Sequence, residues 1–60
     1  MKLIEFTDYH DNPVYINPHY VVRVIPYKDL GDRSVIYLMD KNSYLVRGNV
    51  KDVINLLQRK

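Results

Sequence analysis

Cysteine, alanine and tryptophan are absent from the sequence, and glycine occurs only at Gly31 and Gly48. Without cysteine the chain forms no disulfide, and it lacks the Cys/His cluster of a structural zinc site. Two isolated glycines exclude a P-loop and a glycine-rich dinucleotide motif. Side-chain packing must therefore stabilise the domain. Enzymes that bind nucleotide phosphates through a P-loop or a glycine-rich motif are excluded.

Long hydrophobic runs are absent as well. The apolar stretch at 21–25 is interrupted by Arg23, and it is far shorter than the roughly 20 residues of a membrane-spanning helix. The carboxylate of Glu5 comes too early for the apolar region of a signal peptide. We therefore expect no membrane span and a cytoplasmic location.

The abundant residue types favour β-structure. Valine, isoleucine, threonine and tyrosine supply 20 of the 60 residues, and these types fit a pleated, half-buried surface. With 47% hydrophobic and 27% charged residues and a net charge of +2, the composition is that of an ordinary globular domain. A chain of this length buries only about 60% of the surface of its unfolded form. We expect one domain over residues 1–60, supported by very regular packing or by self-association.

Turn-forming residues divide the first part of the chain into five short segments with the pattern of β-strands. Asp, Asn, Pro and Gly cluster at 8–13, 17–18, 28–33 and 40–42. The strands are expected at 2–7, at 14–16 with Pro13 at the start, and at 20–27, 34–39 and 43–47. We predict a mainly β fold: a five-stranded antiparallel sheet, strongly curled or closed into a small barrel, with one C-terminal α-helix.

The periodicity changes from strand to helix after Gly48. Apolar residues at Val50, Val53, Ile54 and Leu57 follow the i, i+3, i+4, i+7 spacing of one helix face. Asn49 is a good N-cap. A helix over about 49–59 is too short to be stable alone, so we expect this apolar face to pack on the sheet.

Both faces of the predicted sheet are apolar. If Arg23 faces solvent, Val22 and Val24 face inward, and the same alternation places the following residues inward: Ile4, Phe6, Val14, Ile16, Ile36 and Leu38. One helix does not cover the second face as well, and an exposed apolar patch of that size usually marks an interaction surface. We therefore predict a homo-oligomer, most simply a dimer, and a partner-binding surface made of Tyr15, Val21, Arg23, Ile25, Tyr37 and Met39.

Side chains with catalytic potential lack the context that catalysis needs. The hydroxyl groups of Thr7, Ser34 and Ser43 stand in no nucleophile motif. His10 and His19 lie in predicted turns near aspartates, where such residues are usually solvated rather than metal ligands. We expect no enzymatic activity, no cofactor and no metal site.

Nucleic-acid binding is the alternative to protein binding. Tyr15 and Tyr37 with Arg23 have the residue types of a stacking platform for single strands. However, nine basic residues are scattered among seven acidic ones, which does not predict a basic stripe. The sequence therefore favours a small interaction or assembly module acting through protein contacts over an oligomeric RNA- or DNA-binding regulator.

The order of motifs resembles the FlbD-like (SwrD) family, small bacterial proteins encoded among flagellar genes. The resemblance covers nearly the whole chain and rests on these segments: Asp11-Asn12-Pro13-Val14-Tyr15-Ile16-Asn17-Pro18, Val21-Val22-Arg23-Val24, Ile36-Tyr37-Leu38-Met39-Asp40, Tyr44-Leu45-Val46 and the short Val53-Ile54 helix. The sequence departs from the family where Asp11-Asn12-Pro13 replaces Asn-Gly and where Gly48-Asn49 replaces Glu-Ser. The resemblance implies a non-enzymatic role in flagellar motor output through protein contacts, either in a flagellar setting or in a divergent, phage-borne relative.

Overall fold

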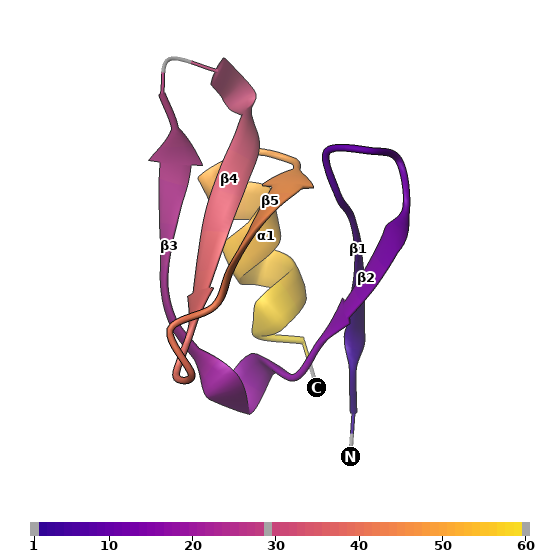
Figure 1. Ribbon diagram of the computed structural model, residues 1–60, viewed down its shortest axis with the longest axis vertical. Coiled ribbons are helices and arrows are strands. Elements are labelled where there is room, and N and C mark those ends of the chain that lie inside the picture. Colours follow the sequence, from indigo (N-terminus) through magenta and orange to yellow (C-terminus); the bar gives the residue numbers. More distant parts are fainter. Residues whose placement is uncertain (1, 29, 60) are drawn as a thin grey trace.

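The computed structural model describes residues 2–28 and 30–59, which fold into a mainly β structure with one C-terminal α-helix, as predicted (Figure 1). The elements in chain order are β1 (Ile4–Thr7), β2 (Pro13–Ile16), the 3-10 helix η1 (Pro18–Tyr20), β3 (Val21–Tyr27), β4 (Leu30–Leu38), β5 (Ser43–Arg47) and α1 (Val50–Leu57). In Figure 1, β4 and β5 lie in front of α1, and the β1–β2 hairpin stands to one side.

The described strands form two antiparallel sheets rather than one. One sheet pairs β1 with β2, and the other has the order β3-β4-β5. An isolated bridge between Asp8 and Val46 brings the end of β1 beside β5, whereas η1 separates β2 from β3. The prediction of a single curled sheet or a small closed barrel is therefore wrong.

The break between β2 and β3 has a local cause. Asn17 caps η1, because its side-chain Oδ1 accepts a hydrogen bond from the backbone N–H of His19 at 3.0 Å. Pro18 occupies the first position of η1, where its missing N–H costs nothing. The resulting turn redirects the chain, so β3 begins a new sheet instead of extending the first.

The β3–β4 hairpin is tighter than predicted. The turn-forming residues at 28–33 predict a polar loop, but β4 already begins at Leu30, and Tyr27 pairs with that residue. Lys28 makes the turn with a φ of 50°. Asp29, which belongs to the predicted loop, lies outside the described residues. The longer hairpin brings 31–33 into the sheet, including Arg33.

The helix begins as the sequence predicts. The Asn49 side chain accepts a hydrogen bond from the backbone N–H of Asp52 at 2.8 Å, which caps α1. Gly48 reverses the chain before it with a φ of 112°, a conformation that favours glycine. A Cβ at this position would also lie 3.6 Å from a methyl group of Val53. That distance is an ordinary van der Waals contact, so the positive φ is the feature that calls for glycine here.

The core is small and draws on both sheets and the helix. Its buried hydrophobic side chains are Phe6, Ile16, Ile36, Val46 and Val53. Each of these comes from a different element among β1, β2, β4, β5 and α1. The core therefore lies between the inner face of β3-β4-β5, the β1–β2 hairpin and α1.

One predicted inward position, Val22, is wrong, and another, Ile54, is only partly covered. Val22 is 64% exposed, because a register shift between Val21 and Arg23 makes it the extra residue of a β-bulge. The bulge turns Val21 toward the core instead of the partner surface. On the helix, Ile54 faces β3 as predicted but is 36% exposed, whereas Leu57 and the unpredicted Leu56 pack against the core.

Candidate interaction surface

The outer face of β3-β4-β5 has an apolar centre. Ile36 and Val46 point into the core, so strand alternation turns Val35 and Leu45 to the opposite side. Val35 pairs with Ile25 on one side and with Leu45 on the other. These three half-buried side chains form a row across the sheet, which we call the apolar row.

An aromatic and basic row borders the apolar row on one side. Arg23 pairs with Tyr37, which in turn pairs with Ser43. The Arg23 guanidinium carbon lies 4.3 Å from the centre of the Tyr37 ring, a cation–π arrangement. The contact holds Arg23 across the sheet, and the stem of such a side chain covers apolar surface while its charge stays in water.

Two arginines border the apolar row on its other side. Arg33 of β4 pairs directly with Arg47 of β5. Like charges placed directly opposite each other destabilise a sheet, so this pair needs compensation. The β1–β2 loop supplies it: Asp11 forms an ion pair with Arg47, and Arg33 lies over the Tyr9 ring at 5.1 Å. We call Arg33 and Arg47 the arginine pair.

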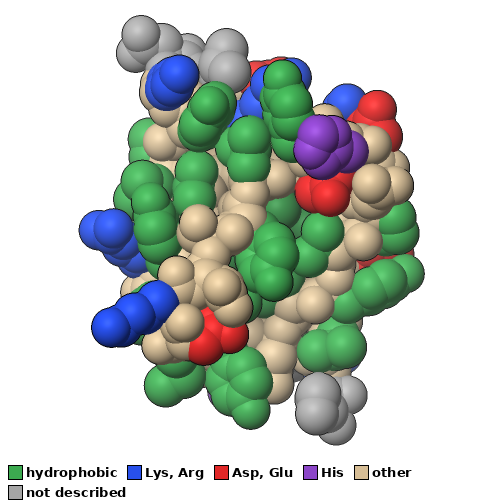
Figure 2. Space-filling view, viewed as in Figure 1, with side chains coloured by type: hydrophobic (Ala, Val, Ile, Leu, Met, Phe, Trp, Pro, Cys, Tyr) green, Lys and Arg blue, Asp and Glu red, His purple; other side chains and the backbone are tan. Residues whose placement is uncertain are grey.

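The outer face is positively charged at both ends. In the described residues of β3, β4 and β5, no carboxylate alternates onto this side, because Asp32 shares its parity with buried Ser34. Figure 2 views the molecule from the side on which β4 and β5 lie in front, with hydrophobic side chains spread over this side, Lys and Arg at its margins, and Asp or Glu side chains also visible there. The acidic groups near this face therefore come from loops, such as Asp11 of the β1–β2 loop, and not from the strands themselves.

The residues predicted for the partner surface are only partly brought together. Arg23, Ile25 and Tyr37 share the outer face of the three-stranded sheet. Tyr15 is 58% exposed but belongs to β2, opposite Glu5 in the other sheet. Val21 precedes the bulge and packs against the core. Met39 is exposed in the turn that follows β4.

The sequence did not indicate Val35, Leu45 and the arginine pair as parts of one site. Val35 is not among the residues predicted for the partner surface, although it pairs with both Ile25 and Leu45. Arg33 falls in the turn-rich stretch 28–33, so the sequence does not predict its pairing with Arg47. Val35 and Arg33 are two residues apart in β4, and Leu45 and Arg47 are two residues apart in β5. Knowledge of the hairpin register would have placed these four side chains on one face.

A second exposed apolar surface lies at one end of β3 and β4. Tyr20, Val22 and Met39 are 56%, 64% and 66% exposed. The backbone N–H of Met39 donates to the carbonyl of Tyr20 at 2.9 Å, which ties the two segments together. Tyr20 and Met39 also line a hollow of about 340 Å³ with Leu38 and Asp40. We call Tyr20, Val22 and Met39 the end patch.

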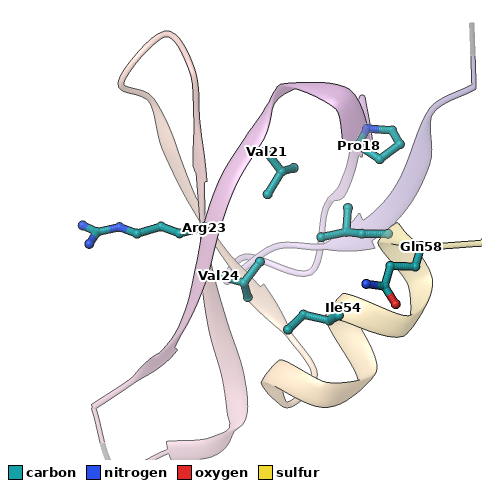
Figure 3. A pocket seen from close by; sticks show the side chains of 7 residues that line it. Pro18, Val21, Arg23, Val24, Ile54 and Gln58 are labelled. Atoms are coloured by element: carbon teal, nitrogen blue, oxygen red, sulfur yellow. The ribbon is translucent and has the colours of Figure 1, made fainter.

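A groove separates β3 from α1. Its volume is about 330 Å³, and its lining includes Val21, Val24 and Ile54. Figure 3 shows Val24 and Ile54 pointing toward one another, whereas the Arg23 side chain points away from the groove. The groove accounts for the partial exposure of Ile54, which forms a wall rather than part of the core.

Residue types that bind metal ions do not cluster in the described part of the chain. Residues 2–28 and 30–59 hold no group of three or more His, Cys, Asp or Glu side chains arranged for a metal ion. The buried hydroxyl of Ser34 donates to the carbonyl oxygen of Gly48 at 2.8 Å, so it is engaged in structure. Among these residues no helix is long and apolar enough to cross a membrane.

Comparison with protein-family models, with curated proteins and with solved structures found no match to this chain. The resemblance to the FlbD-like family therefore stays a prediction from the sequence. The candidate function has to be argued from the surface itself.

Proposed function

We propose that this chain is a non-enzymatic, cytoplasmic binding module that acts through protein contacts. Its contact surface is the outer face of β3-β4-β5. The partner is a protein segment with acidic side chains on both sides of an apolar one. The observation that carries the proposal is the apolar row Ile25–Val35–Leu45, bordered by Arg23 on one side and by the arginine pair on the other.

The spacing of these rows gives the partner a measurable pattern. Residues two apart on one face of a strand are about 6.6 Å apart, so Tyr37 and Arg33, at opposite ends of the face, are about 13 Å apart. An extended segment that runs along the strands matches this distance with acidic residues at i and i+4. The residue at i+2 then meets the apolar row.

A protein segment fits this face better than a nucleic acid. Bases bind single-strand platforms by stacking on open aromatic faces. Here the Tyr37 ring is covered by Arg23, and the Tyr9 ring is covered by Arg33. The centre of the face is aliphatic. Three arginines favour phosphate contacts, so an RNA- or DNA-binding regulator is kept as the alternative that the experiment must exclude.

A second copy of the chain fits a different surface. Stacking two outer faces would bring arginines against arginines, which opposes association. We propose that the predicted homodimer forms through the end patch, where Tyr20, Val22 and Met39 are more than half exposed. Light scattering should give twice the monomer mass of 7.2 kDa, and Val22→Asp should return the monomer. A wild-type monomer at millimolar concentration would contradict the dimer.

The binding face can be tested by selecting peptides from a displayed random library on the immobilised chain. Peptides recovered on the wild type should carry the acid–apolar–acid pattern. They should bind Val35→Asp at least about tenfold more weakly, a loss of about 1.4 kcal/mol. Asn55→Asp is the matched control, because it adds the same charge at an exposed position of α1, which lies on the other side of the sheet. Peptides that lack acidic residues, or that bind Val35→Asp equally, would contradict the proposal.

The nucleic-acid alternative has its own readout. A phosphate binder loses affinity steeply as salt rises, because each contact releases condensed counterions. Retardation of single-stranded RNA at physiological salt, abolished by replacing Arg23 and Arg47 with Glu, would favour the alternative. The flagellar role that the FlbD-like resemblance implies is a further proposal, and the neighbourhood of the gene is the observation that tests it.

A further inference from the structure

The arginine pair is held by the loop of a different sheet. The β1–β2 loop reaches over β5, where the bridge between Asp8 and Val46 anchors it. Two residues of this loop cover the pair: the Tyr9 ring lies against Arg33, and the Asp11 carboxylate binds Arg47. A carboxylate is thus already bound to one member of the pair, Arg47, in this structure.

The loop holds Asp11 in place by its own hydrogen bonds. The Oδ1 of Asp8 accepts from the backbone N–H groups of His10 and Asn12 at 2.8 and 2.9 Å. The backbone N–H of Asp11 donates to the carbonyl of Asp8 at 3.2 Å. Asp11 takes a φ of 66°, an uncommon conformation for a residue other than glycine, though Asp and Asn adopt it more readily than most. The loop therefore directs this carboxylate at Arg47 at the expense of an unusual backbone.

The ion pair between Asp11 and Arg47 is weak enough to be exchanged. The two side chains are 69% and 55% exposed. Exposed ion pairs contribute little, because water screens the charges and two long side chains must be ordered. A carboxylate that is carried by a docked segment, and whose position the apolar row helps to fix, competes with Asp11 on favourable terms.

We propose that the arginine pair is a carboxylate-binding site and that Asp11 is its internal ligand. An acidic side chain of the partner displaces Asp11 from Arg47 and binds between the two guanidinium groups. Directly opposite residues in such a sheet have Cβ atoms about 5 Å apart, so both guanidinium groups can reach one anion. This inference rests on the proposed function and identifies the anchor for one acidic residue of the partner.

The site can be tested with a small anion, independently of any partner. Sodium acetate is titrated against sodium chloride at constant ionic strength, and the arginine Nε–Hε NMR signals are followed. Acetate should shift the signals of Arg33 and Arg47 in the wild type. Asp11→Asn should bind acetate about two- to fivefold more tightly, because an exposed ion pair competes by roughly that factor. Asparagine tolerates the left-handed backbone, so the loop should keep its conformation.

Control variants separate a site from a general charge effect. Asp52→Asn removes one negative charge from the helix and should bind acetate as the wild type does. Arg47→Gln should abolish the shift at Arg33. Equal acetate affinity in Asp11→Asn and Asp52→Asn would show that Asp11 only fastens the hairpin, and it would overturn the inference. Shifts with inorganic phosphate but none with acetate would overturn the assignment to a carboxylate.

The two proposals fail separately. If acetate does not bind but selected peptides still depend on Val35, the anion site is wrong and the binding face stands. If acetate binds the arginine pair but no acid–apolar–acid peptide is selected, the site stands as an anion site without the proposed partner.

Discussion

The inner and outer faces of the three-stranded sheet differ in what lies against them. Ser34, Ile36 and Val46 of the inner face are almost completely buried beneath α1 and the β1–β2 hairpin. Val35 and Leu45 of the outer face are only half-buried, and arginine side chains border them. β4 and β5 thus have one face that is buried in the core and one face that is partly exposed to solvent. Burial on one face supports folding, and partial exposure on the other leaves apolar surface for binding.

The difference also separates the roles of polar groups. The hydroxyl of Ser34 on the inner face is buried with its hydrogen bond satisfied. The arginine pair on the outer face places like charges opposite each other and depends on the hairpin loop for compensation. A cross-strand conflict of this kind weakens the fold locally, and such local conflicts concentrate at functional sites.

The assignment of a buried and an exposed face can be tested by placing aspartate at neighbouring positions of β4. This test has the largest expected effect. Ile36→Asp puts an unpaired carboxylate in the core, at a cost of more than about 4 kcal/mol. A domain of this size has only about 3–5 kcal/mol of stability, so we expect an unfolded chain. Val35→Asp should keep native circular dichroism. A folded Ile36→Asp protein would contradict the assignment of the two faces.

A second pair of variants compares adjacent residues of α1. Val53 is 1% exposed and Ile54 is 36% exposed. Val53→Ala should lower the free energy of unfolding by about 2 kcal/mol, because it leaves a cavity in the core. Ile54→Ala should cost less than about 1 kcal/mol, because the side chain lines an open groove. Urea denaturation measures both, and the reverse order would show that the helix is rotated from its described position.

Removing the buried hydroxyl group of Ser34 on the inner face should lower the free energy of unfolding by a smaller amount. Ser34→Ala removes the donor to the Gly48 carbonyl and should cost about 1–2 kcal/mol. Ser43→Ala is the control, because Ser43 is exposed on the outer face and should change stability by less than about 0.5 kcal/mol. Thermal unfolding of the two variants compares them directly, and equal melting temperatures would count against a structural role for the hydroxyl.

The smallest expected effect lies on the outer face itself. Arg23→Gln removes the cation–π contact with Tyr37 and should cost about 0.5–1 kcal/mol of stability. Arg23→Lys keeps the charge and should lose less. If both variants match the wild type in urea denaturation, the contact with Tyr37 contributes nothing to folding, and its role would be confined to the surface.

About half of the candidate surface was predictable from the sequence. Arg23, Ile25 and Tyr37 lie on one face because simple alternation holds along that part of β3 and β4. Val21 could not be placed, since the bulge at Val22 inverts the parity of the strand before Arg23. Met39 stands in a turn, where alternation no longer applies.

The sequence by itself determined the features with local causes. Asn49 and the apolar spacing after it specify a capped helix, and the clusters at 8–12 and 40–42 specify turns, because these signals act within four residues along the chain. The tertiary structure alone decided how the strands divide into two sheets, that a bulge exposes Val22, and that Arg33 meets Arg47. These outcomes depend on register and on packing between segments far apart in sequence, where a shift of one residue exchanges the buried face for the exposed one.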